Sequence, residues 1–271
     1  MENGKTPHTA QNRRLAALDG QTYLPIFDTI VFFDWYGTLS TSRFWDHITE
    51  APGHALRRIL DRRLEKLFSL EKETISLWMR GELADAEVVA SLAVPLPRRY
   101  KKDYLYRALH RGCEASAVDP GMANLVRELR IRTFTAVATD NMACFLAASP
   151  AALREEAPVD AILSSSERGV LKADDPPRFF APALQAAGMG FSDAVLIDDC
   201  ARTCGAFRSF GGRAYHFESL PKLLEALRDD ASPAVRAAAR HASSTTADIS
   251  PQLALFGSEA APGMSTSRAY P

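Results

Sequence analysis

The sequence predicts an α/β fold with a doubly wound parallel sheet and an inserted helical segment. Short, mostly apolar runs alternate along the chain with helix-compatible segments, and this alternation is typical of parallel strands that helices cover on both faces. A long stretch after the first run carries apolar residues three and four apart, which indicates helices. With 271 residues, 46% of them hydrophobic, the chain is large enough for one such domain and its insert.

Five runs are predicted as strands because each is short, largely apolar and bounded by polar or turn-forming residues. Asp119 and Pro120 mark a helix start before the second run, since aspartate favours the N-cap and proline the first helical position. A final helix is expected over Leu220–Leu227. The predicted strands are Thr29–Asp34, Phe134–Thr139, Ala161–Ser164, Ala194–Asp198 and Arg213–Phe217.

These patterns divide the chain into four parts. Residues 1–22 are polar and aperiodic and are expected to be flexible. Residues 23–40 and 118–230 form the predicted core domain, and residues 41–117 form a helical cap inserted after the first strand. Residues 231–271 are rich in Ala, Ser, Thr and Pro, and this composition predicts a disordered tail.

Composition also restricts the partners. A formal net charge of -1 gives no bulk attraction to nucleic acid or anionic lipid, and no apolar run approaches the length of a membrane span. The N-terminus has no hydrophobic signal core. The four cysteines form no Cys-x-x-Cys pair. We therefore expect a cytoplasmic protein with no membrane and no direct nucleic-acid partner.

Asp34 is the first candidate catalytic residue. The apolar run ends at this carboxylate, and Gly37 follows three residues later in a predicted tight turn. The carboxyl end of a strand in an open α/β sheet is where ligands bind, and a carboxylate there can attack phosphorus or an activated carbon. Gly37 leaves space beside it for substrate. An aspartate before a turn glycine is also ordinary strand-end chemistry, so the motif alone leaves both interpretations open.

Two later segments offer groups that bind anions. Thr139 ends the second predicted strand, and its hydroxyl with Asn141 and the following backbone N–H groups would hold anionic oxygens. A simple N-cap is the alternative. Lys172 precedes a predicted helix, where an ammonium group would neutralise a transferring phosphoryl group and keep the nucleophile ionised. A solvated lysine is the alternative.

Asp198 and Asp199 place two carboxylates at the end of a buried strand. Adjacent like charges are unfavourable there, unless a hard cation such as Mg²⁺ lies between them and a third oxygen ligand, for which Asp34 is the candidate. The alternative is a solvated acidic loop.

In their order and spacing, Asp34-x-x-Gly37, Thr139, Lys172 and Asp198-Asp199 resemble the four motifs of the haloacid dehalogenase superfamily. The helical insert resembles the C1-type cap of that superfamily, and the resemblance extends from about Ile26 to Leu227. It implies a Rossmann-like core in which Asp34 is the nucleophile, Thr139 and Lys172 bind phosphate or carboxylate, and Asp198 or Asp199 completes a magnesium site. The expected reaction is hydrolysis of a small phosphorylated molecule.

One position departs from the phosphatase pattern. Most phosphatases of the superfamily carry a second aspartate two residues after the nucleophile, where this chain has Tyr36. An Asp-x-Tyr-Gly opening looks like the 2-haloacid dehalogenases, which displace halide from carbon without a metal. A catalytically weak binding protein is a third alternative. Tyr36, Gly37, Asn141 and Arg43, a residue just after the catalytic turn, are the predicted substrate-binding residues.

A short apolar segment interrupts the polar tail. Its residues Gln252, Leu253, Leu255 and Phe256 resemble the Gln-Leu-x-Leu-Phe peptide by which bacterial replication and repair proteins bind the sliding clamp. Such a peptide would insert its Leu and Phe into an apolar pocket in an extended conformation. The alternative is that the segment packs on its own domain or binds nothing.

Overall fold

The computed structural model describes residues 27–148, 153 and 155–254. Its centre is a five-stranded, all-parallel sheet with strand order β3-β2-β1-β4-β5, which confirms the predicted fold class. Each predicted strand is present, with ends that differ by at most a residue. The strands are β1 Ile30–Phe33, β2 Phe134–Thr139, β3 Ala161–Ser164, β4 Ala194–Asp198 and β5 Arg213–His216.

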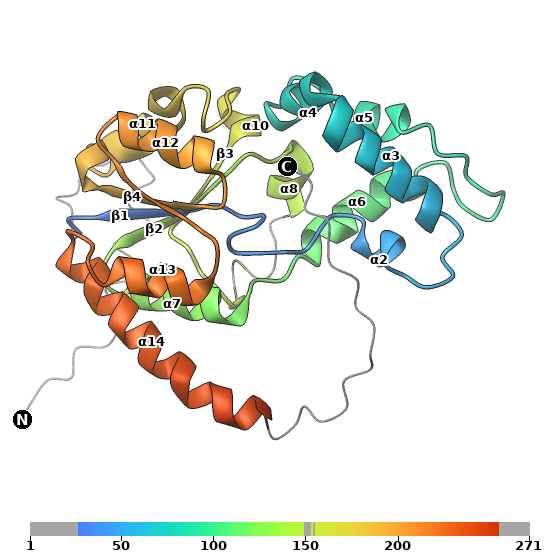
Figure 1. Cartoon of the computed structure of the whole chain (residues 1–271). Helices are drawn as coiled ribbons and strands as arrows, with labels where there is room; N and C mark the ends of the chain where they lie inside the picture. The colour runs from blue at the N-terminus through green and yellow to red at the C-terminus, as the bar shows by residue number, and fades with distance from the viewer. Residues whose placement is uncertain (1–26, 149–152, 154, 255–271) are drawn as a thin grey trace, which may run out of the picture.

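Strand β1 is buried on both faces because it lies in the middle of the sheet. Its alternate side chains belong to two different cores: Ile30 and Phe32 pack with one set of helices, and Val31 and Phe33 with another. Figure 1 shows these helices as layers on the two sides of the sheet. One layer holds α11 Pro176–Ala186 and α12 Ala201–Ser209, and the other holds α7 Pro120–Arg130, α13 Leu220–Leu227 and α14 Pro233–Ala254.

The predicted start of α7 and the predicted bounds of α13 are confirmed. The side chain of Asp119 accepts a hydrogen bond from the backbone N–H of Met122 at 2.9 Å, and Pro120 is the first helical residue. This N-cap satisfies one of the donors that every helix start leaves unpaired.

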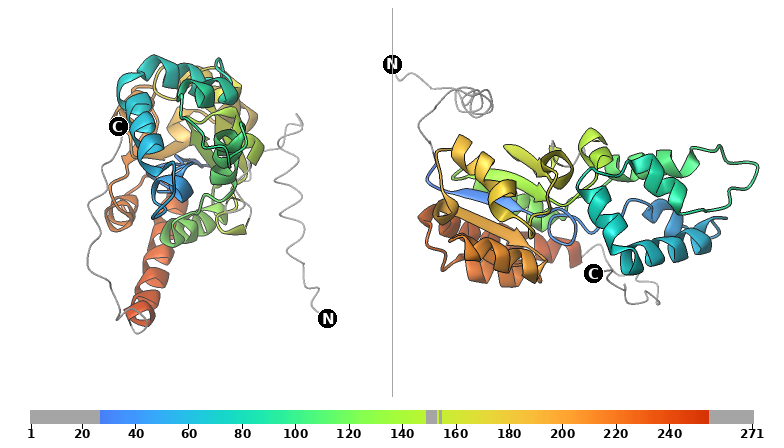
Figure 2. Two further views of the ribbon diagram at one scale, coloured as in Figure 1. Left: turned by 90° about the vertical axis from the view of Figure 1, so that its right-hand side faces the viewer. Right: turned by 90° about the horizontal axis from the view of Figure 1, so that it is seen from above.

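The segment between β1 and α7 folds into helices beside the sheet (Figure 1, Figure 2). The hydroxyl of Ser165, just after β3, donates to the carbonyl of Met79 at 2.6 Å and so connects this insert to the sheet. At Gly81 the backbone has a φ of +73°, and a Cβ there would lie 2.6 Å from the carbonyl oxygen of Ser166. The inserted helices are α2 Asp46–Thr49, α3 Arg57–Leu70, α4 Lys72–Met79, α5 Asp85–Ser91 and α6 Tyr104–Glu114.

The prediction of disorder from residue 231 onward is wrong for residues 233–254, which form α14. Val235, Ala238, Ala239 and Ala242 are buried, and their spacing of three and four residues places them on one helix face. Helix α14 packs against α7 (Figure 1). Alanine is the strongest helix former. The Ala-rich composition from which we predicted disorder is therefore equally compatible with a helix that has a narrow apolar face.

Short elements complete the described chain. They are α8 Ala143–Ala148, α10 Ser165–Arg168 and the 3-10 turn η2 Phe191–Asp193. Within the part of the chain that the structure describes, every helix is too short or too polar to cross a membrane. The predicted flexible segment 1–22 lies outside the described residues, as do Leu255 and Phe256 of the clamp-like motif.

Candidate active site

Asp34 follows β1 directly and is held at the end of the sheet. Its backbone N–H donates to the carbonyl of Ile197 in β4 at 2.9 Å. Its Oδ1 accepts two hydrogen bonds, from the backbone N–H of Trp35 at 2.7 Å and from the ammonium of Lys172 at 2.8 Å. The other oxygen, Oδ2, accepts no hydrogen bond from any residue that the structure describes, and the side chain is 13% exposed. One carboxylate oxygen is therefore fixed and the other is free to react.

Lys172 lies between two of the predicted carboxylates. Its Nζ is 2.8 Å from Oδ1 of Asp34 and 2.7 Å from Oδ2 of Asp198, and the residue is 2% exposed. The backbone N–H of Lys172 donates to the carboxylate of Asp140 at 3.0 Å, which fixes the loop that carries the ammonium group. A buried lysine with two carboxylate partners is a positioned charge and not a solvated side chain.

The local charges shift the pKa values of these groups. Burial alone would lower the pKa of Lys172, but Asp34, Asp198 and Asp140 outweigh it and raise this pKa above its ordinary value. Burial raises the pKa of Asp34 above its ordinary value of 3.8; Lys172 opposes this change, whereas Asp198 adds to it. The site therefore carries more negative charge than one ammonium group can offset.

Gly37 lets Asp199 approach the turn after β1. A Cβ on Gly37 would lie 1.9 Å from Oδ2 of Asp199, and the backbone φ at Gly37 is +82°. A side chain at position 37 is thus disfavoured both by backbone conformation and by space. We predicted that this glycine makes room for substrate; in the structure, the carboxylate of Asp199 occupies that space.

Asp34, Asp198 and Asp199 form a cluster whose oxygens lie within 4.8 Å of one another. Asp198 is fully buried, with Oδ1 accepting the backbone N–H of Cys200 at 2.8 Å and Oδ2 accepting the Lys172 ammonium, while Asp199 is exposed. Carboxylate oxygens are the ligands that Mg²⁺ prefers, and a divalent cation would offset the excess negative charge. The residues present therefore fit a magnesium site.

Thr139 and Asn141 lie together at the end of β2. The side-chain amide of Asn141 donates to the hydroxyl of Thr139 at 3.0 Å, and both residues are almost fully buried. The hydroxyl thus keeps its own proton to donate. The backbone N–H of Asn141 donates to the hydroxyl of Ser165 at 3.1 Å. Strand β2 pairs directly with β1, so Thr139 ends its strand beside the strand that Asp34 follows.

Tyr36 and Arg43 contact each other outside this buried cluster. The guanidinium Nε of Arg43 donates to the phenolic oxygen of Tyr36 at 3.0 Å, and Tyr36 is 37% exposed. This geometry leaves the phenolic proton available to another acceptor. The two predicted substrate-binding residues are therefore paired at the surface of the turn after β1.

Sequence reasoning missed a positioning role for Asp140. Its carboxylate accepts a hydrogen bond from the backbone N–H of Lys172 and so holds the loop that carries the ammonium group. Burial raises the pKa of Asp140, and Lys172 opposes this change. The available signal was its place at a strand end, one residue after Thr139.

Comparisons with known proteins point to the same fold. No protein-family model matches the chain, and no curated protein matches its sequence. Solved structures do match: an L-2-haloacid dehalogenase from Xanthobacter autotrophicus is 18% identical, with a TM-score of 0.51 over 76% of this chain and 85% of that chain. A predicted HAD-like hydrolase from Porphyromonas gingivalis is 15% identical, with a TM-score of 0.51 over 74% and 98%.

A third matching structure is an aspartate-to-alanine variant of a HAD family enzyme from Bacteroides thetaiotaomicron, in complex with magnesium and inorganic phosphate. It is 12% identical, with a TM-score of 0.50 over 72% of this chain and 98% of that chain. At these sequence identities the comparisons establish only the fold. This fold is the one that the sequence motifs predict. The chain has the fold of the haloacid dehalogenase superfamily.

Proposed function

We propose that this protein is a magnesium-dependent hydrolase that cleaves a phosphate ester or acyl phosphate of a small molecule, with Asp34 as the nucleophile. One observation carries the proposal: Oδ2 of Asp34 accepts no hydrogen bond from the described residues and its side chain is 13% exposed, while its Oδ1 is fixed by Lys172 and a backbone N–H. This is the arrangement that nucleophilic catalysis by a carboxylate requires.

In the first step, Oδ2 of Asp34 attacks phosphorus and the bond between phosphorus and the leaving oxygen breaks, which gives an aspartyl phosphate. In the second step, water attacks the phosphorus of that intermediate, and inorganic phosphate and the Asp34 carboxylate are released. Lys172 lies 2.8 Å from Asp34 and offsets negative charge in both steps. The Thr139 hydroxyl donates a hydrogen bond to a phosphoryl oxygen.

Asp34, Asp198 and Asp199 would hold Mg²⁺. When bound, the ion neutralises charge on the phosphoryl oxygens. The pair Asp198-Asp199 favours a phosphatase over a dehalogenase of the metal-independent type, because such a dehalogenase has no use for two further carboxylates beside its nucleophile.

Tyr36 limits the rate of this reaction. It stands where most phosphatases of the superfamily have their general acid/base, and a phenol donates a proton but is a weak base at neutral pH. Loss of general acid/base help lowers a rate by roughly 10²–10⁴-fold. We therefore propose a slow phosphatase or one whose substrate has a good leaving group, such as an acyl or aryl phosphate.

The second candidate is hydrolysis of a carbon–halogen bond, which the Asp34-x-Tyr36 opening favours. In that reaction Oδ2 of Asp34 attacks carbon and halide leaves, and water then hydrolyses the resulting ester. A third candidate, a weakly catalytic binding protein, would use the same site without turnover.

Parallel assays separate the three candidates. Phosphate release from acetyl phosphate and p-nitrophenyl phosphate, with Mg²⁺ and with a chelator, is measured beside halide release from 2-chloropropionate. Magnesium-dependent phosphate release that Asp34→Asn abolishes supports the proposal, with the exposed Asp61→Asn as the matched control. Metal-independent halide release would favour the dehalogenase, and no turnover of either substrate class would favour the binding protein.

A further inference from the structure

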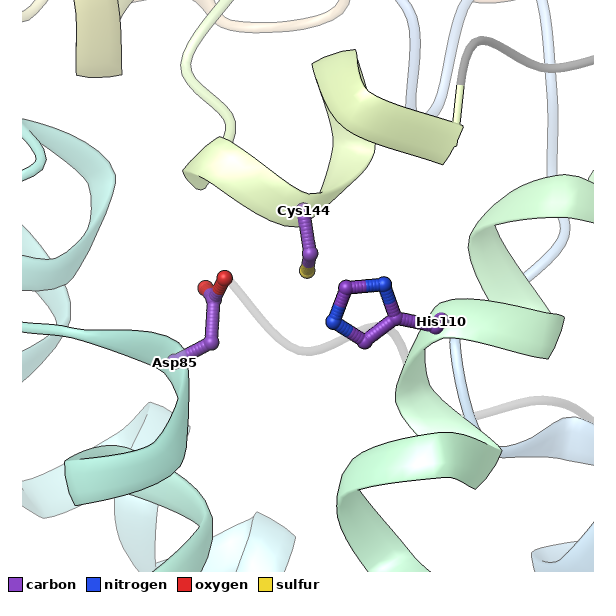
Figure 3. A group of neighbouring side chains, drawn as sticks. All are labelled: Asp85, His110 and Cys144. Carbon is purple, nitrogen blue, oxygen red and sulfur yellow. The ribbon is translucent and has the colours of Figure 1, made fainter.

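A second cluster of metal-ligating side chains lies away from the Asp34 carboxylates. Asp85 begins α5, His110 lies in α6 and Cys144 lies in α8. Each offers one ligand atom, and these three atoms lie within 4.8 Å of one another. Figure 3 shows the three side chains pointing toward a common centre from separate elements. Two of these elements belong to the inserted helices, and the third follows β2.

His110 supplies an independent sign of a missing ligand. Its Nε2 is buried and has no hydrogen-bond partner within the described part of the chain. In Figure 3 a ring nitrogen of His110 faces Asp85 and Cys144. A buried polar atom without a partner is unfavourable, and a bound ion is one of the ways in which a folded protein satisfies it.

Asp85 is already oriented for coordination. Its Oδ1 accepts a hydrogen bond from the indole N–H of Trp78 at 2.7 Å, and Trp78 is fully buried. A hydrogen-bond partner of this kind fixes the orientation of the carboxylate, which is the usual arrangement around a metal ligand.

Cys113 lies beside Cys144 but outside the group of three, so its side chain would have to move toward Asp85 and His110 to supply a fourth ligand. The Sγ atoms of Cys113 and Cys144 are in contact at 3.9 Å. Cys113 also lies three residues after His110, on the same face of α6. Two thiolates on one tetrahedral Zn²⁺ ion, with Zn–S bonds of about 2.3 Å, stand about 3.8 Å apart. The observed distance of 3.9 Å between the two Sγ atoms is close to this expected distance.

The cluster does not have the properties of a nucleophilic Cys-His pair. Cys144 is 1% exposed, so a substrate has no access to its sulfur. A proton on one of the two sulfurs makes the contact between Cys144 and Cys113. A metal ion displaces such protons when it binds.

We propose that Asp85, His110 and Cys144, with Cys113 as the fourth ligand, bind a borderline-soft divalent cation of the Zn²⁺ class. Carboxylate, imidazole and thiolate are the ligand types of such an ion, whereas Mg²⁺ takes oxygen. In a tetrahedral site two ligand atoms stand about 3.3–3.8 Å apart, so the three side chains would move together by up to about 1.5 Å when the ion binds. Both thiols lose their protons to solvent on binding. The ion would join α5 and α6 of the insert to α8 beside the sheet.

Cobalt titration tests this site on the full chain. Co²⁺ replaces Zn²⁺ in such sites, and its bond to thiolate gives an absorption band in the near ultraviolet. The protein is stripped of metal, kept reduced with a phosphine, and titrated in the Asp34→Asn background so that the carboxylate site contributes less. We expect one Co²⁺ per chain, a thiolate band, and loss of that band when one equivalent of Zn²⁺ is added. A folded protein without the band would overturn the proposal.

Three variants locate the ion. His110→Ala removes a nitrogen that makes no hydrogen bond with the residues described in the structure, Asp85→Asn keeps an acceptor for Trp78, and Cys144→Ser removes a thiolate. Each is expected to weaken Co²⁺ binding at least tenfold, and Cys144→Ser also to reduce the thiolate band. The matched control Cys200→Ser changes an exposed cysteine and should leave both unchanged. Circular dichroism checks the fold; unchanged Co²⁺ binding in folded His110→Ala would overturn the site.

Discussion

The ammonium nitrogen of Lys172 lies 2.8 Å from Oδ1 of Asp34, and both side chains are withdrawn from solvent. The same nitrogen lies 2.7 Å from Asp198. These contacts join the loop after α10 to the ends of β1 and β4. Lys172 therefore contributes both to the stability of the fold and to the proposed chemistry.

Replacing Lys172 with Met removes the only ammonium group that the described structure places against Asp34 and Asp198. We expect the free energy of unfolding to fall by about 3–5 kcal/mol, because buried carboxylates are left without their partner. Urea denaturation measures this change. Lys222→Met is the control, since Lys222 pairs with Glu218 at the exposed surface, and its midpoint should stay at the wild-type value. Equal effects of the two substitutions would contradict the assigned role of Lys172.

Gly37→Ala tests the close approach of Asp199 to the turn. Gly53 is a matched control, because its φ is +75° and a Cβ there would meet nothing within 4 Å. Both substitutions carry the cost of a left-handed backbone, roughly 1–2 kcal/mol. Gly37→Ala should cost up to about 1 kcal/mol more, because the Asp199 carboxylate, the end of an exposed side chain, must turn away from the new Cβ. Thermal unfolding measures both variants, and similar losses of stability would contradict the proposed contact.

The stability of the protein also tests whether α14 is a packed helix and not a disordered tail. Val235 is fully buried in the core that α7 and α14 share, so Val235→Ala should lower the free energy of unfolding by about 2 kcal/mol. Arg240→Ala, at an exposed position of the same helix, is the control and should change stability little. A disordered segment would give the wild-type value for both variants in chemical denaturation.

The clamp-like motif leads to a separate binding prediction. Gln252 falls within α14, whereas Leu255 and Phe256 follow it in the sequence. We expect the full chain to be retained on an immobilised bacterial sliding clamp, and retention to be lost in Leu255→Ala/Phe256→Ala. Replacing the exposed Phe210 with Ala is the control for a loss of general hydrophobic binding. Equal retention of the double variant and the wild type would argue against the motif.

Much of this architecture could be predicted because it depends on local patterns. The strands are apolar runs between polar segments, and a parallel sheet brings their carboxyl ends to one edge. For that reason Asp34, Lys172 and the Asp198-Asp199 pair, although far apart in the sequence, are found together as expected.

Other features depend on packing that no short pattern records. The Ala-rich and Ser-rich sequence of α14 has the composition of a disordered tail, and only its packing against α7 shows that it is a helix with buried alanines. Asp85, His110 and Cys144 come from three separate helices, and no spacing in the sequence links them. The close approach of Asp199 to Gly37 also depends on tertiary structure, because Asp199 follows β4 and Gly37 lies in the turn after β1.

The covalent state of Asp34 tests the central claim most directly. Wild-type protein and Asp34→Asn are mixed with acetyl phosphate and Mg²⁺, quenched in acid, and examined by intact-protein and peptide mass spectrometry. We predict that wild-type protein gains the mass of one phosphoryl group on the peptide that contains Asp34, and that Asp34→Asn gains none. Phosphate release without any phosphoryl group on that peptide, or the same modification in Asp34→Asn, would contradict the account.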